Sequence, residues 1–346
     1  MQVALVVGKE KIEIRDFPNP EPAPGRAVVK ISYCGICGTD LHAYHGGAPY
    51  NPAICGHEWA GTLVSKGNDV PDLREGDRVG IGVAPACGSC PECRAGDSAH
   101  CGATMMSMVG VGPMAAKHGG FASAISIEAS RLYPLRSSVS DISAAMLEPA
   151  TVAIHALRRT PLRLGDAVVV LGAGPIGLLI LQCARAAGAG CVVVVEPEPT
   201  RAALAATLGA TAVINPKTED TGERTKAICG PLGADVVFEC AGIPATIDQS
   251  ASLVKRGGVV SLVGLSAVPA EISPGTWLAR EVRLVASLGY LHEEFDMAMQ
   301  LVEDERLQLE SLHSGTVGLH EIDGAFRQLL SGGGEVKILV DPNKGA

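Results

Sequence analysis

The segment Val168–Gly177 constrains the fold of this chain more than any other part of it. It reads VVVLGAGPIG, an apolar run that leads directly into Gly172, Gly174 and Gly177 and then into a helical pattern. The first glycine permits a tight turn, the second lets the backbone approach a pyrophosphate, and the third lets the helix pack close to the strand. The helix N-terminus adds amide donors and a positive dipole for the phosphates. The segment therefore predicts a strand–turn–helix unit that binds a dinucleotide.

An acidic residue follows the next apolar run. Glu196 lies 19 residues after Gly177, at the end of Val192–Val195, where a carboxylate can accept both hydroxyl groups of the adenosine ribose. Its charge would repel a 2′-phosphate, which favours NAD over NADP. Arg201 is close by in the sequence and can pair with such a phosphate, so NADP stays open as the less favoured cofactor. The alternative is a glycine-rich turn in an unrelated α/β protein, against which the strand, helix and acid together argue.

Short apolar runs alternate with alanine-rich helical stretches from Ala167 to about Tyr290. Near-continuous apolar strands joined by helices are typical of a parallel sheet covered on both faces. We therefore predict an α/β fold with a doubly wound sheet in this region. The expected strands are Val168–Leu171, Val192–Val195, Ala212–Ile214, Val236–Phe238, Val259–Val263 and Val282–Ala286. The expected helices are Ile176–Ala187, Arg201–Leu208 and Ala245–Val254.

The first 150 residues have a different pattern, in which short alternating strands are joined by loops. A chain of 346 residues exceeds what one hydrophobic core usually fills, so we divide it into residues 1–150, 151–290 and 291–346. The strands expected in the first part are Val3–Val7, Lys11–Ile14, Ala27–Ser32, Gly61–Val64, Asp77–Ile81 and Phe121–Ile127. The remaining expected elements are the helices Asp141–Leu157, Glu294–Glu303 and Ile322–Leu330 and a closing strand at Val336–Val340.

The composition argues against several kinds of partner. Aromatic residues make up only 3% of the chain, so it lacks the stacking surface that binds single-stranded nucleic acid. The net charge is −9, and basic residues are not clustered, which argues against binding to nucleic-acid phosphates. No apolar stretch reaches the ~20 residues that a membrane span requires. The N-terminal residues lack the pattern of a signal peptide. We therefore expect a cytoplasmic protein that binds neither nucleic acid nor a membrane.

Four cysteines, Cys87, Cys90, Cys93 and Cys101, lie within one stretch of fifteen residues. Four thiolates this close together favour tetrahedral zinc with no open position, which is a structural site. The loop contains little apolar material, so the bound metal would supply its order. An iron–sulfur cluster or redox-active cysteine pairs are the less favoured alternatives.

A second set of metal-binding residue types is dispersed over three motifs, CGICGTDLH, GHE and EP. Thiolate, imidazole and carboxylate groups are all good zinc ligands, and a three-ligand set leaves a fourth position for water or substrate. Each residue taken alone also has a structural explanation, as a buried cysteine, a satisfied histidine or a helix-start charge. The spacing alone does not decide between these interpretations. The residues are Cys34, Cys37, Thr39, Asp40, His42, His57, Glu58 and Glu148.

The order of five motifs along the chain resembles the zinc-containing medium-chain dehydrogenase/reductase family. The motifs are, in order, GICGTDLH, GHEWAG, the four-cysteine loop, EPATVAIHAL and VVVLGAGPIG. The resemblance covers essentially the whole chain and is greatest to the branch of sorbitol (polyol), butanediol and threonine dehydrogenases. It implies a GroES-like catalytic domain formed by both chain ends, with a Rossmann domain inserted between them. It also implies oxidation of a secondary alcohol, diol or polyol by NAD, two zinc ions per subunit, and a homotetramer or dimer.

The resemblance assigns Cys37 and His57 as catalytic zinc ligands and Cys34 as a packing residue. The alcohol dehydrogenase pattern has a second cysteine at the position of Glu148, so this chain departs from it. Polyol-type relatives use a glutamate, and either Glu58 or Glu148 is expected to bind zinc directly while the other lies close or binds through water. Asp40 is expected to orient the ring of His57 through its free nitrogen.

The resemblance further implies a proton path and a set of cofactor contacts. Thr39 would take the proton of the substrate hydroxyl, and His42 would relay it through the cofactor ribose to solvent. Ile176 would pack against the nicotinamide, and the backbone near Val263 and Leu265 would hold its carboxamide. A helix cap and a surface histidine are the structural alternatives for Thr39 and His42. The expected cofactor contacts are Gly172, Gly174, Pro175, Ile176, Gly177, Glu196, Arg201, Val263 and Leu265.

Two other functions compete with this one. A zinc-free quinone or enoyl reductase of the same superfamily would lack the four-cysteine loop and the pair Cys37 and His57, both of which are present. An NAD-binding protein without turnover would leave the intact set of metal ligands unexplained. We therefore expect a zinc-dependent alcohol dehydrogenase.

Overall fold

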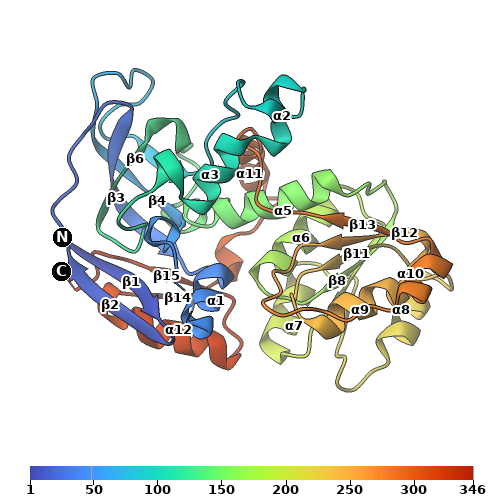
Figure 1. Cartoon of the computed structure of the whole chain (residues 1–346). Coiled ribbons are helices and arrows are strands. Elements are labelled where there is room, and N and C mark those ends of the chain that lie inside the picture. Colours follow the sequence, from blue (N-terminus) through green and yellow to red (C-terminus); the bar gives the residue numbers. More distant parts are fainter. Residues whose placement is uncertain (48, 346) are drawn as a thin grey trace.

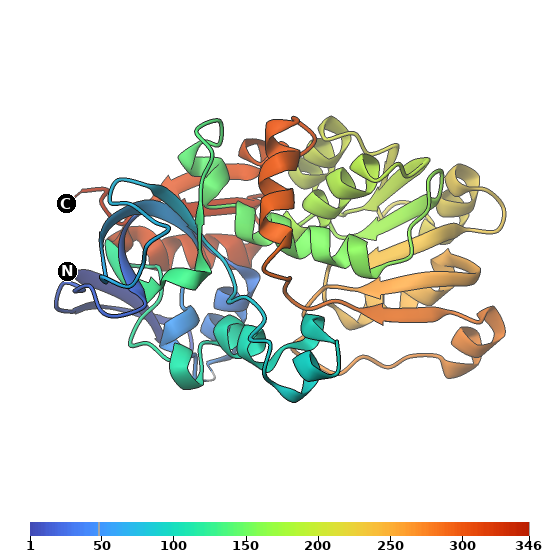
Figure 2. The ribbon, with the colours of Figure 1, turned by 90° about the horizontal axis from the view of Figure 1, so that it is seen from above.

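The computed structural model describes residues 1–47 and 49–345, and its elements form two lobes that lie side by side (Figures 1 and 2). One lobe contains the strands and helices between residues 167 and 286. The other lobe is assembled from both ends of the chain, and the two termini lie close together on its outer side in both views. The chain therefore leaves the second lobe, builds the first, and returns.

The first lobe is built around a six-stranded parallel sheet with the strand order β10-β9-β8-β11-β12-β13. In chain order this is 3-2-1-4-5-6, the doubly wound arrangement that binds dinucleotides where the order reverses. The predicted parallel sheet is confirmed, because all six expected strands are present. The strands are β8 (Ala167–Leu171), β9 (Cys191–Val195), β10 (Ala212–Ile214), β11 (Ala234–Glu239), β12 (Val254–Leu262) and β13 (Arg283–Ala286).

Helices cover both faces of this sheet (Figure 1). The three expected helices are present, and two further helices, α8 and α10, were not predicted. Both are short, and their sequences TGERTKAIC and PGTWLAR contain too few apolar residues to give a helical period. The helices are α6 (Pro175–Ala186), α7 (Pro199–Thr207), α8 (Thr221–Cys229), α9 (Pro244–Leu253) and α10 (Pro274–Arg280).

The second lobe contains a mainly antiparallel sheet with the order β14-β15-β3-β4-β5-β7, in which β6 also pairs with β3. A separate hairpin, β1 with β2, lies beside it. The two chain ends meet inside the larger sheet, where Leu339 of β15 lies opposite Gly35 of β3. The strands are β1 (Gln2–Gly8), β2 (Lys11–Asp16), β3 (Arg26–Gly35), β4 (Glu58–Lys66), β5 (Arg78–Ile81), β6 (Ala124–Glu128), β7 (Leu132–Pro134), β14 (His313–Val317) and β15 (Lys337–Val340).

The predicted helix over Asp141–Leu157 is wrong in one respect, because the structure contains two helices there with a break at Ala145 and Met146. Pro149 explains the break: a proline inside a helix clashes with the carbonyl group four residues earlier, which here is that of Ala145. The helices outside the parallel sheet are α1 (Gly38–Gly46), α2 (Pro91–Arg94), α3 (Gly102–Val109), α4 (Asp141–Ala144), α5 (Leu147–Arg159), α11 (Glu294–Glu303) and α12 (Ile322–Ser331).

Helices α5 and α11 lie between the two lobes (Figure 2). A charged network joins them: His155 Nδ1 lies 2.9 Å from one carboxylate oxygen of Glu294, and Arg158 donates to the other at 3.0 Å. Glu294 is 1% exposed, so its charge depends on these partners. Within residues 1–47 and 49–345, no helix is long and apolar enough to span a membrane.

Candidate metal centre and cofactor site

The pairing of two strands brings the first candidate ligands together. Gly35, at the end of β3, lies directly opposite Glu58, at the start of β4. Cys37 follows the end of the first strand and His57 precedes the start of the second, so the antiparallel register places them side by side. Single ligand atoms of Cys37, His57 and Glu58 all lie within 4.8 Å of one another. This donor set of sulfur, nitrogen and oxygen fits zinc.

Cys37 is held in place by the start of helix α1, of which it is the N-cap residue. Its sulfur accepts a hydrogen bond from the backbone N–H of Thr39 at 3.4 Å. The carboxylate of Asp40 in turn accepts from the backbone N–H of Cys37 at 3.0 Å, which completes a capping box. These two hydrogen bonds fix the position of the Cys37 sulfur at the start of α1.

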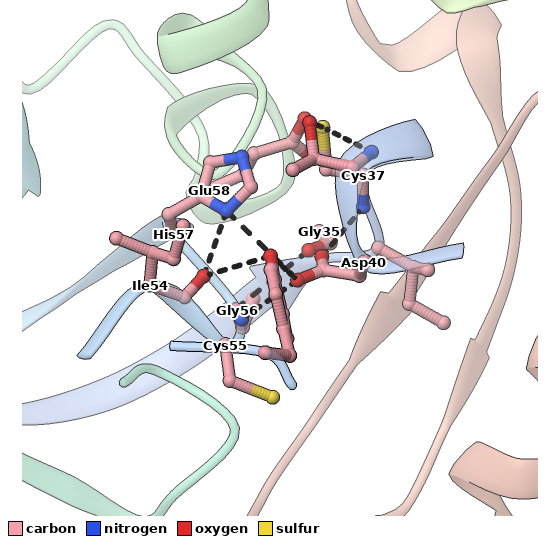
Figure 3. A network of polar contacts seen from close by, with 12 residues as sticks. Gly35, Cys37, Asp40, Ile54, Cys55, Gly56, His57 and Glu58 are labelled. Atoms are coloured by element: carbon pink, nitrogen blue, oxygen red, sulfur yellow. Dashed lines mark hydrogen bonds and ion pairs between the residues drawn. The ribbon is translucent and has the colours of Figure 1, made fainter. Parts of the chain in front are cut away.

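The ring of His57 has one nitrogen fixed by the backbone (Figure 3). Its Nδ1 lies 2.9 Å from the carbonyl oxygen of Ile54, so Nδ1 carries the proton and donates it. The other nitrogen, Nε2, is then free to bind a metal. Asp40 Oδ1 lies 3.9 Å from the same nitrogen, so the carboxylate expected to orient this ring faces it at ion-pair distance without a hydrogen bond. That oxygen instead accepts from the Tyr50 hydroxyl at 2.7 Å and the Gly56 N–H at 3.2 Å.

Glu58 is paired with a buried cation. The Nζ of Lys337, on β15, donates to Glu58 Oε2 at 2.6 Å and to the carbonyl oxygen of Ile36 at 3.0 Å. Both charged side chains are 2% exposed. Burial alone would lower the pKa of Lys337, but the negative charges of Glu58 and Cys37 outweigh it and raise this pKa, which keeps the lysine cationic. A Cβ atom on Gly35 would lie 2.3 Å from Glu58 Oε2, so only glycine leaves room for this carboxylate.

The second carboxylate, Glu148, comes from the first turn of α5. The charges of His57, Glu58 and Lys337 all influence the ionisation of Glu148. Glu148 nevertheless does not belong to the group of three residues, described above, whose ligand atoms lie within 4.8 Å of one another. Burial raises the pKa of Glu148 to about 7, and the nearby charge of Glu58 adds to the increase. The buried Tyr290 lies beside it and favours its ionised form.

The four cysteines of the loop Cys87–Cys101 converge as a second group, with ligand atoms within 4.8 Å of one another. The sulfurs of Cys90 and Cys101 are 3.9 Å apart, which matches the edge of about 3.8 Å that a tetrahedron of zinc–sulfur bonds of about 2.3 Å requires. Hydrogen bonds from Ser89 and from the backbone N–H of Cys90 lower the pKa of Cys87 to about 6. The chemistry and spacing of this group therefore fit zinc.

The glycine-rich turn lies at the carboxyl end of β8. Gly172 has a φ of 95°, a conformation that favours glycine. A Cβ atom on Gly177 would lie 1.9 Å from the carbonyl oxygen of Gly172, so helix α6 can approach the strand only because this residue is glycine. Gly174 faces open space, and Pro175 occupies the first position of α6, where its missing N–H costs nothing.

The other candidate cofactor residues lie at the same edge of the sheet, because the carboxyl ends of parallel strands share one edge. Glu196 follows β9 and is 5% exposed; its carboxylate accepts from the N–H of Ala173 at 2.7 Å and of Glu198 at 2.9 Å. Val263 follows β12 and donates its N–H to the carbonyl oxygen of Glu239 at 3.0 Å. Leu265, two residues later, is 57% exposed.

Comparison with known proteins shows what this arrangement belongs to. Residues 23–137 match the model of the alcohol dehydrogenase GroES-like domain, and residues 175–304 match that of the zinc-binding dehydrogenase. The (R,R)-butanediol dehydrogenase of Bacillus subtilis (strain 168) is 31% identical, with 99% of this chain and 100% of that protein aligned. The chain belongs to the zinc-dependent alcohol dehydrogenase family. It is an oxidoreductase, and the resemblance drawn from its motifs is confirmed.

Other members of the zinc alcohol dehydrogenase family agree with this assignment. The sorbitol dehydrogenase of Bacillus subtilis (strain 168) is 34% identical over 270 residues, which are 77% of this chain and 75% of that protein. A solved structure from Sinorhizobium meliloti 1021, described as a zinc-binding dehydrogenase bound to NADP, has a TM-score of 0.85 at 32% identity and covers 99% of each chain. The predicted GroES-like and Rossmann architecture is therefore confirmed.

Helix α1 carries two further residues that the family pattern indicates, Thr39 and His42. They lie three residues apart, so they share one face of the helix. The Thr39 hydroxyl lies 3.6 Å from the sulfur of Cys37, in the first turn of the helix. His42 is exposed to solvent. Thr39 is not the helix cap, since Cys37 occupies that position.

Sequence reasoning missed Lys337, Tyr50 and Gly35 in this alcohol dehydrogenase. A signal existed for Lys337: a lysine inside the apolar strand sequence KILV is rarely buried without a partner of opposite charge. The partner itself, Glu58, lies 279 residues away in the sequence, and only the pairing of β15 with β3 brings the two together.

Proposed function

We propose that this enzyme oxidises a secondary alcohol, diol or polyol reversibly to the ketone or aldehyde, with NAD as the hydride acceptor. The observation that carries the proposal is the convergence of Cys37, His57 and Glu58 within 4.8 Å, with the Nδ1 of His57 tied to a backbone carbonyl oxygen. When bound there, zinc would supply a positive charge that lowers the pKa of a hydroxyl group beside it. The butanediol and sorbitol dehydrogenases among the relatives support the substrate class.

The ligand set we propose for this zinc is Cys37, His57 and Glu58, with Glu148 close by. Glu58 has one oxygen bound by Lys337, which leaves the other oxygen free for a metal. Glu148 lies outside the group of converging ligand atoms, although it influences the same charges. Glu58→Gln should therefore abolish zinc binding at this site, whereas Glu148→Gln should retain the metal and lose part of the turnover. Equal metal loss in both variants would contradict this division of roles.

For the proton we propose a path along helix α1. Thr39 takes the proton of the substrate hydroxyl, because its own hydroxyl lies 3.6 Å from the candidate ligand Cys37. His42, on the same face and exposed to solvent, would pass the proton outward, and the ribose of a bound cofactor would connect the two residues. Thr39→Val should cut turnover and leave the zinc content intact. Unchanged turnover would refute the path.

We propose NAD rather than NADP as the cofactor. The phosphates would lie at the turn of Gly172, Gly174, Pro175, Ile176 and Gly177, with Ile176 against the nicotinamide and the backbone near Val263 and Leu265 on its carboxamide. Glu196 would accept the adenosine ribose hydroxyls, since a carboxylate has acceptor sites beyond the two used by backbone amides. The guanidinium of Arg201 donates two hydrogen bonds to the carbonyl oxygen of Glu335, at 2.9 and 3.2 Å. Because Arg201 already has this partner, it is less available to bind the 2′-phosphate of NADP.

Two zinc ions per subunit complete the proposal, the second one structural and held by Cys87, Cys90, Cys93 and Cys101. We assign residues 1–150 and 291–346 to the catalytic domain and 151–290 to the Rossmann domain. We also propose a cytoplasmic homotetramer, or a dimer. The parallel sheet ends in β13, whose outer edge lacks a strand partner within the described residues and whose Leu284 is 54% exposed, so a second copy could extend the sheet there.

One experiment tests the function directly. Purified zinc-loaded protein would be assayed by NADH and NADPH absorbance against a panel of secondary alcohols, diols, polyols and ethanol. We expect turnover with NAD on at least one diol or polyol, and loss of that turnover when a chelator removes the metal. Full turnover without metal would indicate a zinc-free reductase. If the protein bound NAD and zinc but showed no turnover, it would be a protein without catalytic activity.

A further inference from the structure

Two cysteines that the proposed function does not use lie next to each other in the Rossmann lobe. Cys191 is the first residue of β9, and Cys229 is the last residue of α8. Their sulfur atoms are 3.8 Å apart, although the residues are separated by 38 positions in the sequence. Both side chains are partly exposed, so small molecules can reach them. A disulfide bond of about 2.05 Å needs the two sulfurs to approach by less than 2 Å.

This pair lies at the amino ends of the parallel strands, whereas the cofactor residues lie at their carboxyl ends. Cys191 begins β9, whereas Glu196 follows its carboxyl end, and five residues of extended chain span about 16 Å. Neither cysteine belongs to the two groups of candidate metal ligands found among the described residues. The pair is therefore separate from both proposed zinc sites and from the hydride transfer.

We propose that Cys191 and Cys229 are a reversible thiol–disulfide pair that exchanges with low-molecular-weight disulfides. The thiolate of Cys191 attacks one sulfur of the small disulfide, forms a mixed disulfide and releases one small thiolate. The thiolate of Cys229 then attacks the sulfur of Cys191 and releases the second small thiolate. In total, two protein thiols lose two electrons and two protons, and one small disulfide gains them and becomes two small thiols.

The surroundings of the Cys229 sulfur indicate that this residue reacts second. Burial and the neighbouring Cys191 raise the pKa of Cys229 to about 12, so this thiol is a poor nucleophile toward an external reagent. Cys229 reacts second, when the mixed disulfide on Cys191 is held beside it and the reaction is intramolecular.

Closing the bond would affect a defined part of the chain. The loop from Cys191 to Cys229 contains β9, α7, β10 and α8, and it carries Glu196 and Arg201. A cross-link over 39 residues restricts the unfolded chain and so stabilises the folded one. Oxidation therefore protects the adenosine-binding half of the sheet against unfolding under oxidising conditions, and reduction removes that protection.

The test uses the full-length, zinc-loaded protein, so that the candidate zinc ligands are protected. The protein is incubated with oxidised glutathione, alkylated, and digested with trypsin without reduction. We expect one linked product of residues 186–201 with residues 227–255, and a melting temperature about 5–10 °C higher that returns to its original value with dithiothreitol. The second peptide also contains Cys240, so its fragment ions must place the link on Cys229.

Matched variants keep the result interpretable. Cys191→Ser and Cys229→Ser should each abolish the linked product and the temperature shift, while melting like the reduced parent protein. Cys183→Ala, which removes a buried cysteine outside the pair, should keep both effects. A link through Cys240, or glutathione that stays on Cys191 without ring closure, would overturn the proposal, as would the absence of any linked product.

Discussion

The substitution Lys337→Met removes the only buried positive charge that touches Glu58 among the described residues and leaves a side chain of similar length. The two charged atoms are 2.6 Å apart and both side chains are 2% exposed. At an effective dielectric constant of about 20, such charges attract each other by about 6 kcal/mol. Desolvation of the two ions costs several kcal/mol each, so the pair contributes little net stability. Removing only the lysine leaves the desolvated carboxylate, and we expect a loss of about 3–5 kcal/mol.

The assay is urea denaturation of four proteins: the parent, Lys337→Met, Glu58→Gln, and the double variant. In metal-free protein, the double variant should lose much less stability than Lys337→Met alone, because no unpaired charge is then buried. In zinc-loaded protein, the cost of Lys337→Met should shrink, since the metal's positive charge can replace that of the ammonium group. Two results together would refute the account of a buried, interacting pair. The free energy of unfolding of Lys337→Met would lie within about 1 kcal/mol of that of the parent, and the effects of the two substitutions would be additive.

Three further outcomes follow from other contacts. Burial opposes ionisation of Glu294, but hydrogen bonds from His155 and the Leu291 N–H outweigh it and lower its pKa below the ordinary value of 4.5. Glu294→Gln should therefore cost about 2 kcal/mol at pH 7. The difference should shrink below the ordinary pKa and disappear as the pH falls through the lowered pKa of the folded state, as urea titrations at several pH values would show. Gly35→Ala should displace Glu58 and reduce bound zinc measured by atomic absorption, whereas Gly38→Ala, where a Cβ meets open space, should not. Cys90→Ser should lower the zinc content from two ions to one per chain and make the loop Cys87–Cys101 sensitive to protease; a retained second ion would contradict the four-thiolate site.

Local sequence patterns predicted the Rossmann lobe well, because its strands are continuous apolar runs and its glycine-rich turn works through neighbours in the sequence. Gly177, for example, must clear the carbonyl oxygen of Gly172 only five residues away. The break at Ala145 could have been predicted in the same way from Pro149. The short helices α8 and α10 could not, since few apolar residues mark them.

The metal centre is different, because its members meet through strand pairing. The motif spacing suggested ligands, but the closeness of Cys37 and His57 depends on the register that places Gly35 opposite Glu58. The partner of the His57 ring is a carbonyl oxygen, that of Ile54, and no side-chain pattern can reveal a backbone acceptor. Resemblance to a family therefore indicated the residue types, and the structure supplied the partners.

The pairing of β15 with β3 also has a consequence for the order in which the enzyme matures during synthesis. The first strand of the centre is made within 35 residues, but the ammonium group that neutralises Glu58 arrives only at position 337. Until then the carboxylate of Glu58 lacks its lysine partner, and the end of β3 at Cys34 and Gly35 lacks the strand that pairs with it. We therefore expect the candidate metal centre to be completed late in biosynthesis, after the Rossmann lobe has emerged.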